Sequence, residues 1–469
     1  MLRVEKEEQV FKEEAMGKAP GRSYKRICLL MLGVLMVALL AACAPAATPT
    51  AAPTKAPAAA PTTAPAAANP TAAPKPTTAS APTAASAPPT AAPKPTTAAV
   101  APTGTPIKIG FLTPLTGPSG PFGWLESVSV SLAEADVNAA GGINGRPLQI
   151  IRYDSPFDPV QAVTLVRKLE GTDKVFAILG PYSSGEMDVA APLANELKIP
   201  VIGMKTTKPN FSEHNRPWEF RFTVTDDIST PAVIAAFKKA NPSITGVVIV
   251  GDTKNAVSAS MVNDVWPKYL KEAGLTIQGT VGYDSGTTDF SAIVTKIKDL
   301  KPQGIAYSAP PPGNPVGFAK ELAAQQVTVP VVASPHFVPS NIVFAAGAAM
   351  EGWLAASFFD PTRPDASVQD FAKRWQAKAD ADTNIVKPAR LSLEANDYDV
   401  VMILADIMRK ANITPETPLL DARTKIRDGM AAVKGYNGLS GTINMGANGD
   451  ATWPAVIVKA QGGAWVPVK

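Results

Sequence analysis

The stretch Val175-Phe-Ala-Ile-Leu-Gly-Pro-Tyr-Ser-Ser-Gly185, with residues 186–197 and Pro200-Val-Ile-Gly203 behind it, decides the fold. The unbroken apolar run that ends at Gly180 is typical of a strand buried on both faces. Residues 186–197 have the spacing of an amphipathic helix, and 200–203 form a second short apolar run. Strand, turn, helix and strand in this order predict a βαβ unit with parallel strands.

The same alternation continues on both sides of this stretch. Two successive series of similar size predict an α/β protein with two doubly wound parallel-sheet lobes. The further predicted strands are 107–112, 148–153, 246–251, 276–283, 304–307 and 329–333, and the further predicted helices are 125–140, 159–169, 258–273, 290–300 and 316–325. Ligands of such sheets bind beyond the carboxyl ends of the strands, and clefts between lobes are preferred sites. We therefore expect the site at the turns that follow the strands.

Three of these turns carry small, hydroxylated or aromatic residues, at 115–124, 180–185 and 205–209. Ser184 lies where a helix is predicted to begin, so free backbone N–H groups and the helix dipole would point into the cleft. A carboxylate could be held there without a formal positive charge. The alternative is that the hydroxyls of this turn and of the 205–209 turn only cap helices.

Together with Gly141-Gly-Ile-Asn-Gly145 and the stretch 153–162, these turns resemble those of type I periplasmic binding proteins. The most similar group is the leucine/isoleucine/valine-binding family of ABC-importer receptors, and the resemblance covers residues 105–469. It implies a receptor whose lobes close by a hinge around a small-molecule ligand and which then docks on the permease subunits of an importer.

The resemblance also implies that the chain crosses between the lobes three times, through a three-strand hinge. Lobe one is expected to comprise about 105–226 and 356–452. Lobe two is expected to comprise about 227–355 and 453–469, with a carboxyl-terminal hairpin completing it.

By resemblance, Ser184 and Thr207 match the positions that hold the α-carboxylate of the ligand. Their neighbours Ser183, Thr206 and Tyr182 are expected at the same site. Phe122 and Trp124 could form an aromatic wall over the ligand, or could belong to the core.

The second lobe departs from the family pattern. Ala256 stands where the family usually has a tyrosine, and His336 stands where the acid that binds an ammonium group is expected. The turn 309–313 replaces an aromatic turn. A cation in a partly dry cleft needs a carboxylate or an aromatic face. We therefore expect a small carboxylate or amino-acid-like ligand, preferably an aromatic or branched carboxylate without an ammonium group; Lys205 is either its charge partner or solvated.

The segment Leu40-Ala41-Ala42-Cys43 indicates where the protein acts. Lys25 and Arg26 precede an uncharged apolar run, residues 27–42, as in a secretory signal peptide. The segment resembles the lipobox of bacterial lipoproteins, which implies cleavage before Cys43, a lipid on its sulfur, and an extracytoplasmic, membrane-tied protein. An uncleaved anchor is the alternative, although the run is shorter than the ~20 residues of a span. Met16 is an alternative start for translation.

Residues 43–104 are almost entirely Ala, Pro and Thr. These residues have too little apolar surface to offset the loss of chain entropy on folding. We therefore expect them to form a disordered, extended tether that follows a signal peptide at 1–42. Glycosylation of the tether is left open.

Composition narrows the function further. Residues 1–104 hold ten basic and five acidic residues, which leaves 34 basic and 35 acidic residues in 105–469. A folded part that is nearly neutral lacks the excess of positive charge that is typical of a nucleic-acid-binding protein. The two histidines are far apart in the sequence and there is no cluster of cysteines, so we expect neither a metal site nor a cofactor. The sequence also contains no known catalytic motif. We expect a monomeric binding protein; a sensor for a separate signalling receptor is the alternative, and an enzyme built on His214 or His336 a weaker one.

Overall fold

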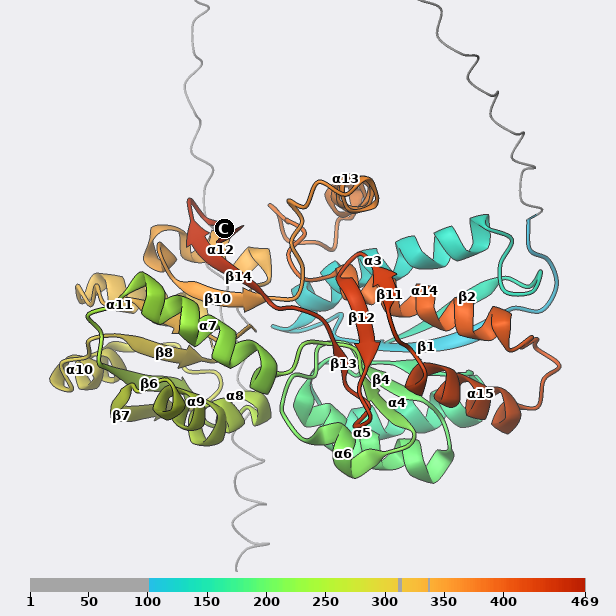
Figure 1. The fold of residues 1–469 in the computed structure, drawn as a ribbon, viewed down its shortest axis with the longest axis horizontal. Helices are drawn as coiled ribbons and strands as arrows, with labels where there is room; N and C mark the ends of the chain where they lie inside the picture. Colours follow the sequence, from blue (N-terminus) through green and yellow to red (C-terminus); the bar gives the residue numbers. More distant parts are fainter. Residues whose placement is uncertain (1–100, 311–313, 336–337, 469) are drawn as a thin grey trace, which may run out of the picture. The chain divides into compact units, whose positions relative to one another are not determined.

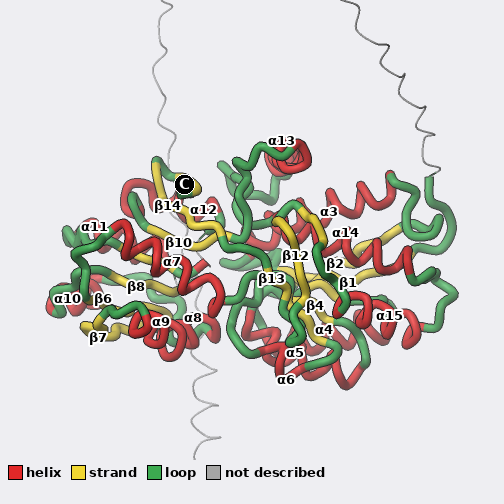
Figure 2. The backbone as a smooth tube through the Cα atoms, in the orientation of Figure 1, coloured by secondary structure: helices red, strands yellow, loops and turns green. Residues whose placement is uncertain are grey.

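The computed structural model describes residues 101–468 except 311–313 and 336–337. The predicted signal peptide, Cys43, most of the tether and His336 therefore lie outside the described residues. Parallel strands and the helices that cover them make up most of the described chain (Figures 1 and 2).

Lobe one is built on a parallel sheet with the strand order β2-β1-β3-β4-β5. Its strands are β1 (Ile107–Thr113), β2 (Leu148–Asp154), β3 (Ile178–Leu179), β4 (Val201–Gly203) and β5 (Glu219–Arg221). Side chains alternate between the faces of a strand. Ile109 and Phe111 accordingly join one core, whereas Leu112 joins the core on the opposite face.

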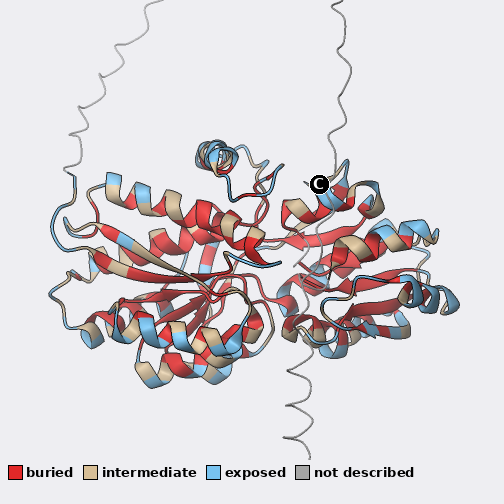
Figure 3. Cartoon of the chain, turned by 180° about the vertical axis from the view of Figure 1, so that it is seen from behind, coloured by how far each residue is buried: buried red, intermediate tan, exposed pale blue. Residues whose placement is uncertain are grey.

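Helices cover both faces of this sheet. They are α3 (Gly120–Ala139), α4 (Pro159–Gly171), α5 (Ser184–Leu197), α6 (Phe211–Asn215), α13 (Ala366–Ala381), α14 (Ala395–Lys410) and α15 (Leu419–Ala431). α3 packs against α14 and α13 on one side, and α4 packs against α5 on the other. In Figure 3 the central strands are buried, while the helices are buried on one side and exposed on the other.

Lobe two has the strand order β15-β14-β10-β9-β8-β6-β7. Its strands are β6 (Gly246–Asp252), β7 (Thr276–Tyr283), β8 (Ile305–Ser308), β9 (Val331–Ala333), β10 (Leu354–Ser357), β14 (Val456–Gln461) and β15 (Ala464–Pro467). The strands from β6 to β10 are parallel, and β14 and β15 form an antiparallel hairpin on β10.

The helices of lobe two are α7 (Asp226–Ala240), α8 (Ala256–Ser260), α9 (Trp266–Glu272), α10 (Ser291–Asp299), α11 (Pro315–Ala324) and α12 (Ser340–Ala346), with a π-helical turn η1 (Met261–Val265) and a 3-10 turn η3 (Gly347–Met350). The continuous helix predicted for 258–273 is instead α8, η1 and α9 in succession. Pro267, in the first turn of α9, has no backbone N–H, and a widened turn before it accommodates this lost donor.

The chain passes between the lobes after β5, after β10 and after β13 (Ala451–Thr452). A small antiparallel sheet of β11 (Tyr436–Gly438), β12 (Gly441–Met445) and β13 precedes the last passage. The predicted α/β fold with doubly wound parallel-sheet lobes is confirmed.

The start of α3 corrects one boundary. The predicted helix begins at residue 125, but α3 begins at Gly120, with Pro121 in its first turn. Gly123 permits this: a Cβ there would lie 1.7 Å from the Pro114 carbonyl oxygen, so only glycine lets α3 approach the end of β1 this closely. Phe122 and Trp124 therefore belong to a helix and not to a loop.

Among the described residues, none of the helices combines the length and the apolar character needed to cross a membrane.

Candidate functional site: a cavity lined by both lobes

A cavity is lined by side chains of both lobes at the carboxyl ends of their strands. Its volume is about 580 Å³, open solvent at the mouth included. Its lining residues are Phe122, Phe157, Tyr182, Ser183, Ser184, Lys205, Thr207, Asn255, Val257, Pro310, Pro335, Pro339, Phe358 and Leu393. Of the residues expected at the site from the sequence, Phe122, Tyr182, Ser183, Ser184 and Thr207 are thus brought together.

The amino terminus of α5 forms one polar wall. Ser183 is its N-cap: the Ser183 hydroxyl donates to Glu186 Oε2 (2.8 Å) and accepts from the Glu186 backbone N–H (3.2 Å). Ser183 therefore performs the capping role considered as the alternative. Ser184 is the first helical residue and is 3% exposed, and no hydrogen bond within the described part of the chain uses its hydroxyl. The free N–H groups of this first turn suit an anion.

The segment after β4 forms the adjoining wall. The Thr207 hydroxyl donates to Asp226 Oδ2 (3.0 Å), and the Thr207 carbonyl accepts from the Asp226 backbone N–H (3.0 Å). Because Asp226 begins α7, the first helix of lobe two, Thr207 connects the cavity to the passage between the lobes. Thr206 is fully buried and is not a lining residue; its side chain packs over Gly203, where a Cβ would lie 2.1 Å from Thr206 Oγ1.

Aromatic and aliphatic side chains of lobe one and of the passage after β10 form the apolar walls. The rings of Phe157 and Tyr182 lie 5.6 Å apart, and Phe122, Phe358 and Leu393 complete the surface. Flat apolar walls of this kind suit a planar or branched ligand.

Trp124 lies elsewhere. Residues two apart on a helix point about 200° from each other, so Phe122 and Trp124 cannot face the same cavity. The Trp124 indole N–H donates to the Leu115 carbonyl (3.0 Å), and its ring packs on the core beneath α13. The structure thus favours the core alternative for this residue.

Lobe two contributes a mostly apolar wall. Asn255 caps α8 by accepting from the backbone N–H groups of Val257 (3.1 Å) and Ser258 (3.3 Å). Ala256 does not line the cavity and instead faces Gly185 of α5. Pro310 and Pro335 flank the segments 311–313 and 336–337, so the role expected of His336 remains a prediction.

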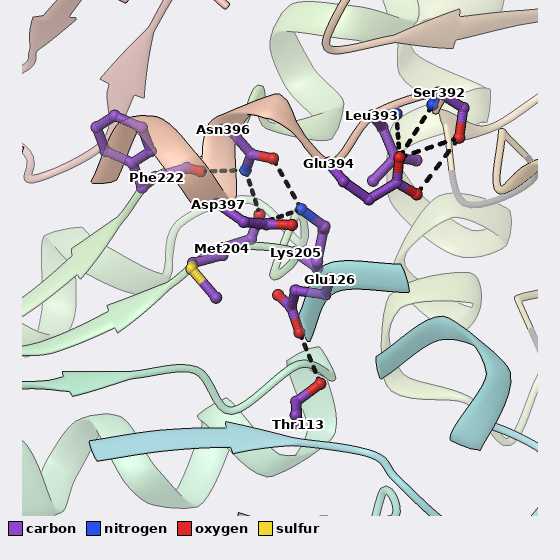
Figure 4. A network of polar contacts seen from close by, with 10 residues as sticks. All are labelled: Thr113, Glu126, Met204, Lys205, Phe222, Ser392, Leu393, Glu394, Asn396 and Asp397. Atoms are coloured by element: carbon purple, nitrogen blue, oxygen red, sulfur yellow. Dashed lines mark hydrogen bonds and ion pairs between the residues drawn. The ribbon is translucent and has the colours of Figure 1, made fainter. Parts of the chain in front are cut away.

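A buried polar cluster, shown in Figure 4, adjoins the cavity through Lys205. The Lys205 ammonium donates to Asn396 Oδ1 (2.7 Å) and is ion-paired with Asp397 Oδ1. The Asn396 amide in turn donates to the carbonyls of Met204 (2.9 Å) and Phe222 (2.8 Å). Asn396 is fixed by the ends of β4 and β5, and it therefore fixes the Lys205 ammonium.

Two further carboxylates belong to this cluster. Glu126 Oε2 accepts from the Thr113 hydroxyl (2.7 Å), and Glu394 Oε2 accepts from the backbone N–H groups of Ser392 (2.9 Å) and Leu393 (3.0 Å). Burial raises the pKa of Glu126 to about 7, although the Lys205 charge lowers it in part. Burial likewise raises the pKa of Asp397, against the opposing effect of Lys205.

The charged groups are unevenly placed around the cavity. Lys205 is the one charged side chain among the described lining residues, while the nearby carboxylates of Glu126 and Asp397 are 1% and 0% exposed. A cavity with a cation, a helix N-terminus and apolar walls can bind an anion with an apolar body. Fold and cavity together define a two-lobed solute-binding protein that acts by binding.

Comparison with known proteins gives the family. The family model described as periplasmic binding protein matches residues 106–464. The chain belongs to this family, as a type I periplasmic binding protein of the leucine/isoleucine/valine-binding group. It is a substrate-binding protein and not an enzyme, and members of this class work outside the cytoplasm.

The relatives are distant in sequence and similar in fold. The Leu/Ile/Val-binding protein homolog 2 of Brucella abortus (strain 2308) is 27% identical over 260 residues, which cover 55% of this chain and 69% of the relative. A leucine-binding protein LivK from Thermotoga maritima matches with a TM-score of 0.68 and 23% identity, over 77% of this chain and 98% of that one. A solute-binding protein from R. palustris in complex with benzoate matches with a TM-score of 0.67 and 20% identity, over 78% and 96%.

Proposed function

We propose that this chain is the lipid-anchored substrate-binding protein of an ABC importer of the branched-chain amino acid type. It would bind a small carboxylate or amino-acid-like ligand in the cavity between the lobes, as a monomer, and deliver it to the permease subunits. The observation that carries the proposal is the cavity itself, which joins the amino terminus of α5 to the aromatic side chains of lobe one and to the mostly apolar wall of lobe two. The names of relatives that bind leucine, isoleucine and valine support the ligand class.

Within that class, the charge of the cavity favours a carboxylate without an ammonium group. None of the described lining residues is acidic, and the sequence of the adjoining segments 311–313 and 336–337 contains no acidic residue. An α-amino acid would bring its ammonium group into a partly dry cavity without a counter-ion, which costs several kcal/mol. Structural relatives bound to benzoate and to 4-hydroxybenzoate support an aromatic carboxylate as the ligand.

Isothermal titration of the purified protein tests the ligand class. We expect benzoate or 4-methylpentanoate to bind, and leucine to bind at least tenfold more weakly, because leucine adds an unpaired ammonium charge worth more than 1.4 kcal/mol. Leucine binding that equals or exceeds binding of the carboxylates would contradict the assignment of the ligand class, while the role as a substrate-binding protein would stand.

Lipid attachment is tested separately in cells. Cys43→Ser is expected to abolish incorporation of labelled fatty acid, because Cys43 is the only cysteine after the apolar run. The matched control is Cys28→Ser, which lies inside that run and should leave labelling unchanged. Fatty-acid labelling that persists in the Cys43 variant would overturn the anchor.

A further inference from the structure

Lys205 occupies a position that a merely solvated lysine would not. It follows β4 at the carboxyl edge of the lobe-one sheet, its side chain is only 4% exposed, and it lines the cavity. Lysine is almost never buried unless it is paired. The burial therefore excludes the solvated alternative left open by the sequence.

The direction of the Lys205 side chain is set by α14. Asn396 and Asp397, both fully buried in the first turn of α14, each take one hydrogen bond from the ammonium (Figure 4). An ammonium has three N–H donors. The third is not used in any hydrogen bond among the described residues, and Lys205 borders the cavity.

Stability does not account for such an arrangement. A buried ion pair is often no more stabilising than apolar residues of the same volume, because both charges lose their hydration. Here the desolvation is large, and the second oxygen of Asp397 has no hydrogen-bond partner in the described part of the chain. Perturbed, buried charges beside a cavity are typical of functional sites.

The side chains that act electrostatically on the surroundings of Lys205 are carboxylic acids and a phenol, so Lys205 is the cation among them. The titratable groups that bear on its surroundings are Glu126 from α3, Glu394 and Asp397 from the start of α14, and Tyr182 from the turn before α5. Burial holds the pKa of Tyr182 well above its usual value, so that phenol stays neutral. Burial also keeps Glu126 partly protonated near neutral pH.

We infer that Lys205 is the specificity-determining residue of the cavity: its ammonium, positioned by Asn396 and Asp397, pairs with the carboxylate of the ligand and selects anions over neutral analogues. Ser184 and the first turn of α5 line the same cavity and would receive the same carboxylate. The inference rests on the proposed function as a binder of small carboxylates, and it names the residue that gives this preference.

The test compares a carboxylate with its neutral amide in wild-type protein and in variants. Titration calorimetry with benzoate and benzamide, and with 4-methylpentanoate and its amide, should show a preference for the acids of at least tenfold in the wild type. Lys205→Met should weaken acid binding at least tenfold and change amide binding less than threefold, so that the preference disappears. The matched control is Lys208→Met, three residues along the chain at the surface, which should leave both affinities unchanged.

Removal of Lys205 leaves Asp397 unpaired in the core, so a second variant guards against misfolding. Lys205→Met/Asp397→Asn removes both charges. This variant should fold, and it should also lack the preference for acids over amides. The preference of the wild type should also persist in 0.5 M NaCl, because a buried pair is screened much less than a surface pair.

The outcomes separate the inference from the proposed function. If the wild type binds acids but both Lys205 variants keep the full preference, the inference is wrong and the proposed function stands. If the wild type binds neither acids nor leucine, both fail.

Discussion

Asp450→Ala is expected to lower the free energy of unfolding by about 3–5 kcal/mol, the range found when one partner of a buried ion pair is removed. Arg221 on β5 is 1% exposed; its Nε and Nη2 donate to Asp450 at 2.7 and 2.5 Å. Asp450 also accepts from the hydroxyl of Ser212 (2.7 Å) and the amide of Asn448 (2.8 Å). Truncation would leave the Arg221 guanidinium buried without the carboxylate that forms its ion pair. Urea unfolding followed by circular dichroism measures the change.

A surface pair provides the control for this prediction. Asp188 lies 3.0 Å from the Lys208 ammonium, with both side chains at least 31% exposed. Asp188→Ala should therefore change stability by no more than about 1 kcal/mol. Arg221→Met/Asp450→Leu should recover part of the loss, since it removes both charges. A single Asp450 variant within 1 kcal/mol of the wild type would show that Arg221 finds water or another partner.

Most strands of the two sheets, although not β5 and β10, could be predicted from the sequence because they carry a strong local signal. The apolar run at 246–251 lies within β6, fully buried, and the predicted strand 276–283 has the same bounds as β7. Buried parallel strands need apolar side chains on both faces, so the pattern is visible within a few residues. Helix boundaries were less secure, because they depend on contacts outside the helix.

α3 illustrates that dependence. Its first turn contains Gly120, Pro121 and Gly123, residues that indicate a loop when read locally. They are helical here because glycine allows the close approach to the Pro114 carbonyl at the end of β1. The five-residue shift of the helix start decides that Phe122 lines the cavity and Trp124 does not.

The membership of the polar cluster could not be predicted from the sequence. Lys205 and its partners Asn396 and Asp397 are about 190 residues apart in sequence, and Glu126 lies on yet another helix. A sequence pattern shows local periodicity, whereas this cluster depends on α3 and α14 packing together on one face of the sheet. The one local signal was a set of polar residues, Glu126 and Asn396 among them, within otherwise apolar helix segments.

Glu219→Gln is expected to make the protein more stable at pH 8 by roughly 3 kcal/mol, and at pH 5 by less than about 1 kcal/mol. Glu219 is fully buried on β5, near Ser212 and Arg221. Burial raises its pKa from 4.5 to about 7. Between these pH values the folded state keeps a proton that the unfolded chain releases, so stability is full below pH 4.5 and falls as the pH rises through 7. At about 1.36 kcal/mol per pKa unit, the loss at pH 8 is roughly 3 kcal/mol.

Glutamine imitates the protonated acid, so the variant should not lose this contribution as the pH rises. The measurement is the free energy of unfolding at several values between pH 5 and 8, in both proteins. Burial also raises the pKa values of Glu126 and Glu186 to about 7. These two groups make the same contribution to the pH dependence of stability in the wild type and in the variant, so their contribution cancels when the two curves are subtracted. Glu213→Gln, an exposed residue of α6, should give a curve parallel to that of the wild type. A Glu219 variant that also runs parallel to the wild type would mean that this carboxylate ionises in the folded protein at little cost, and that the region around Arg221 admits water.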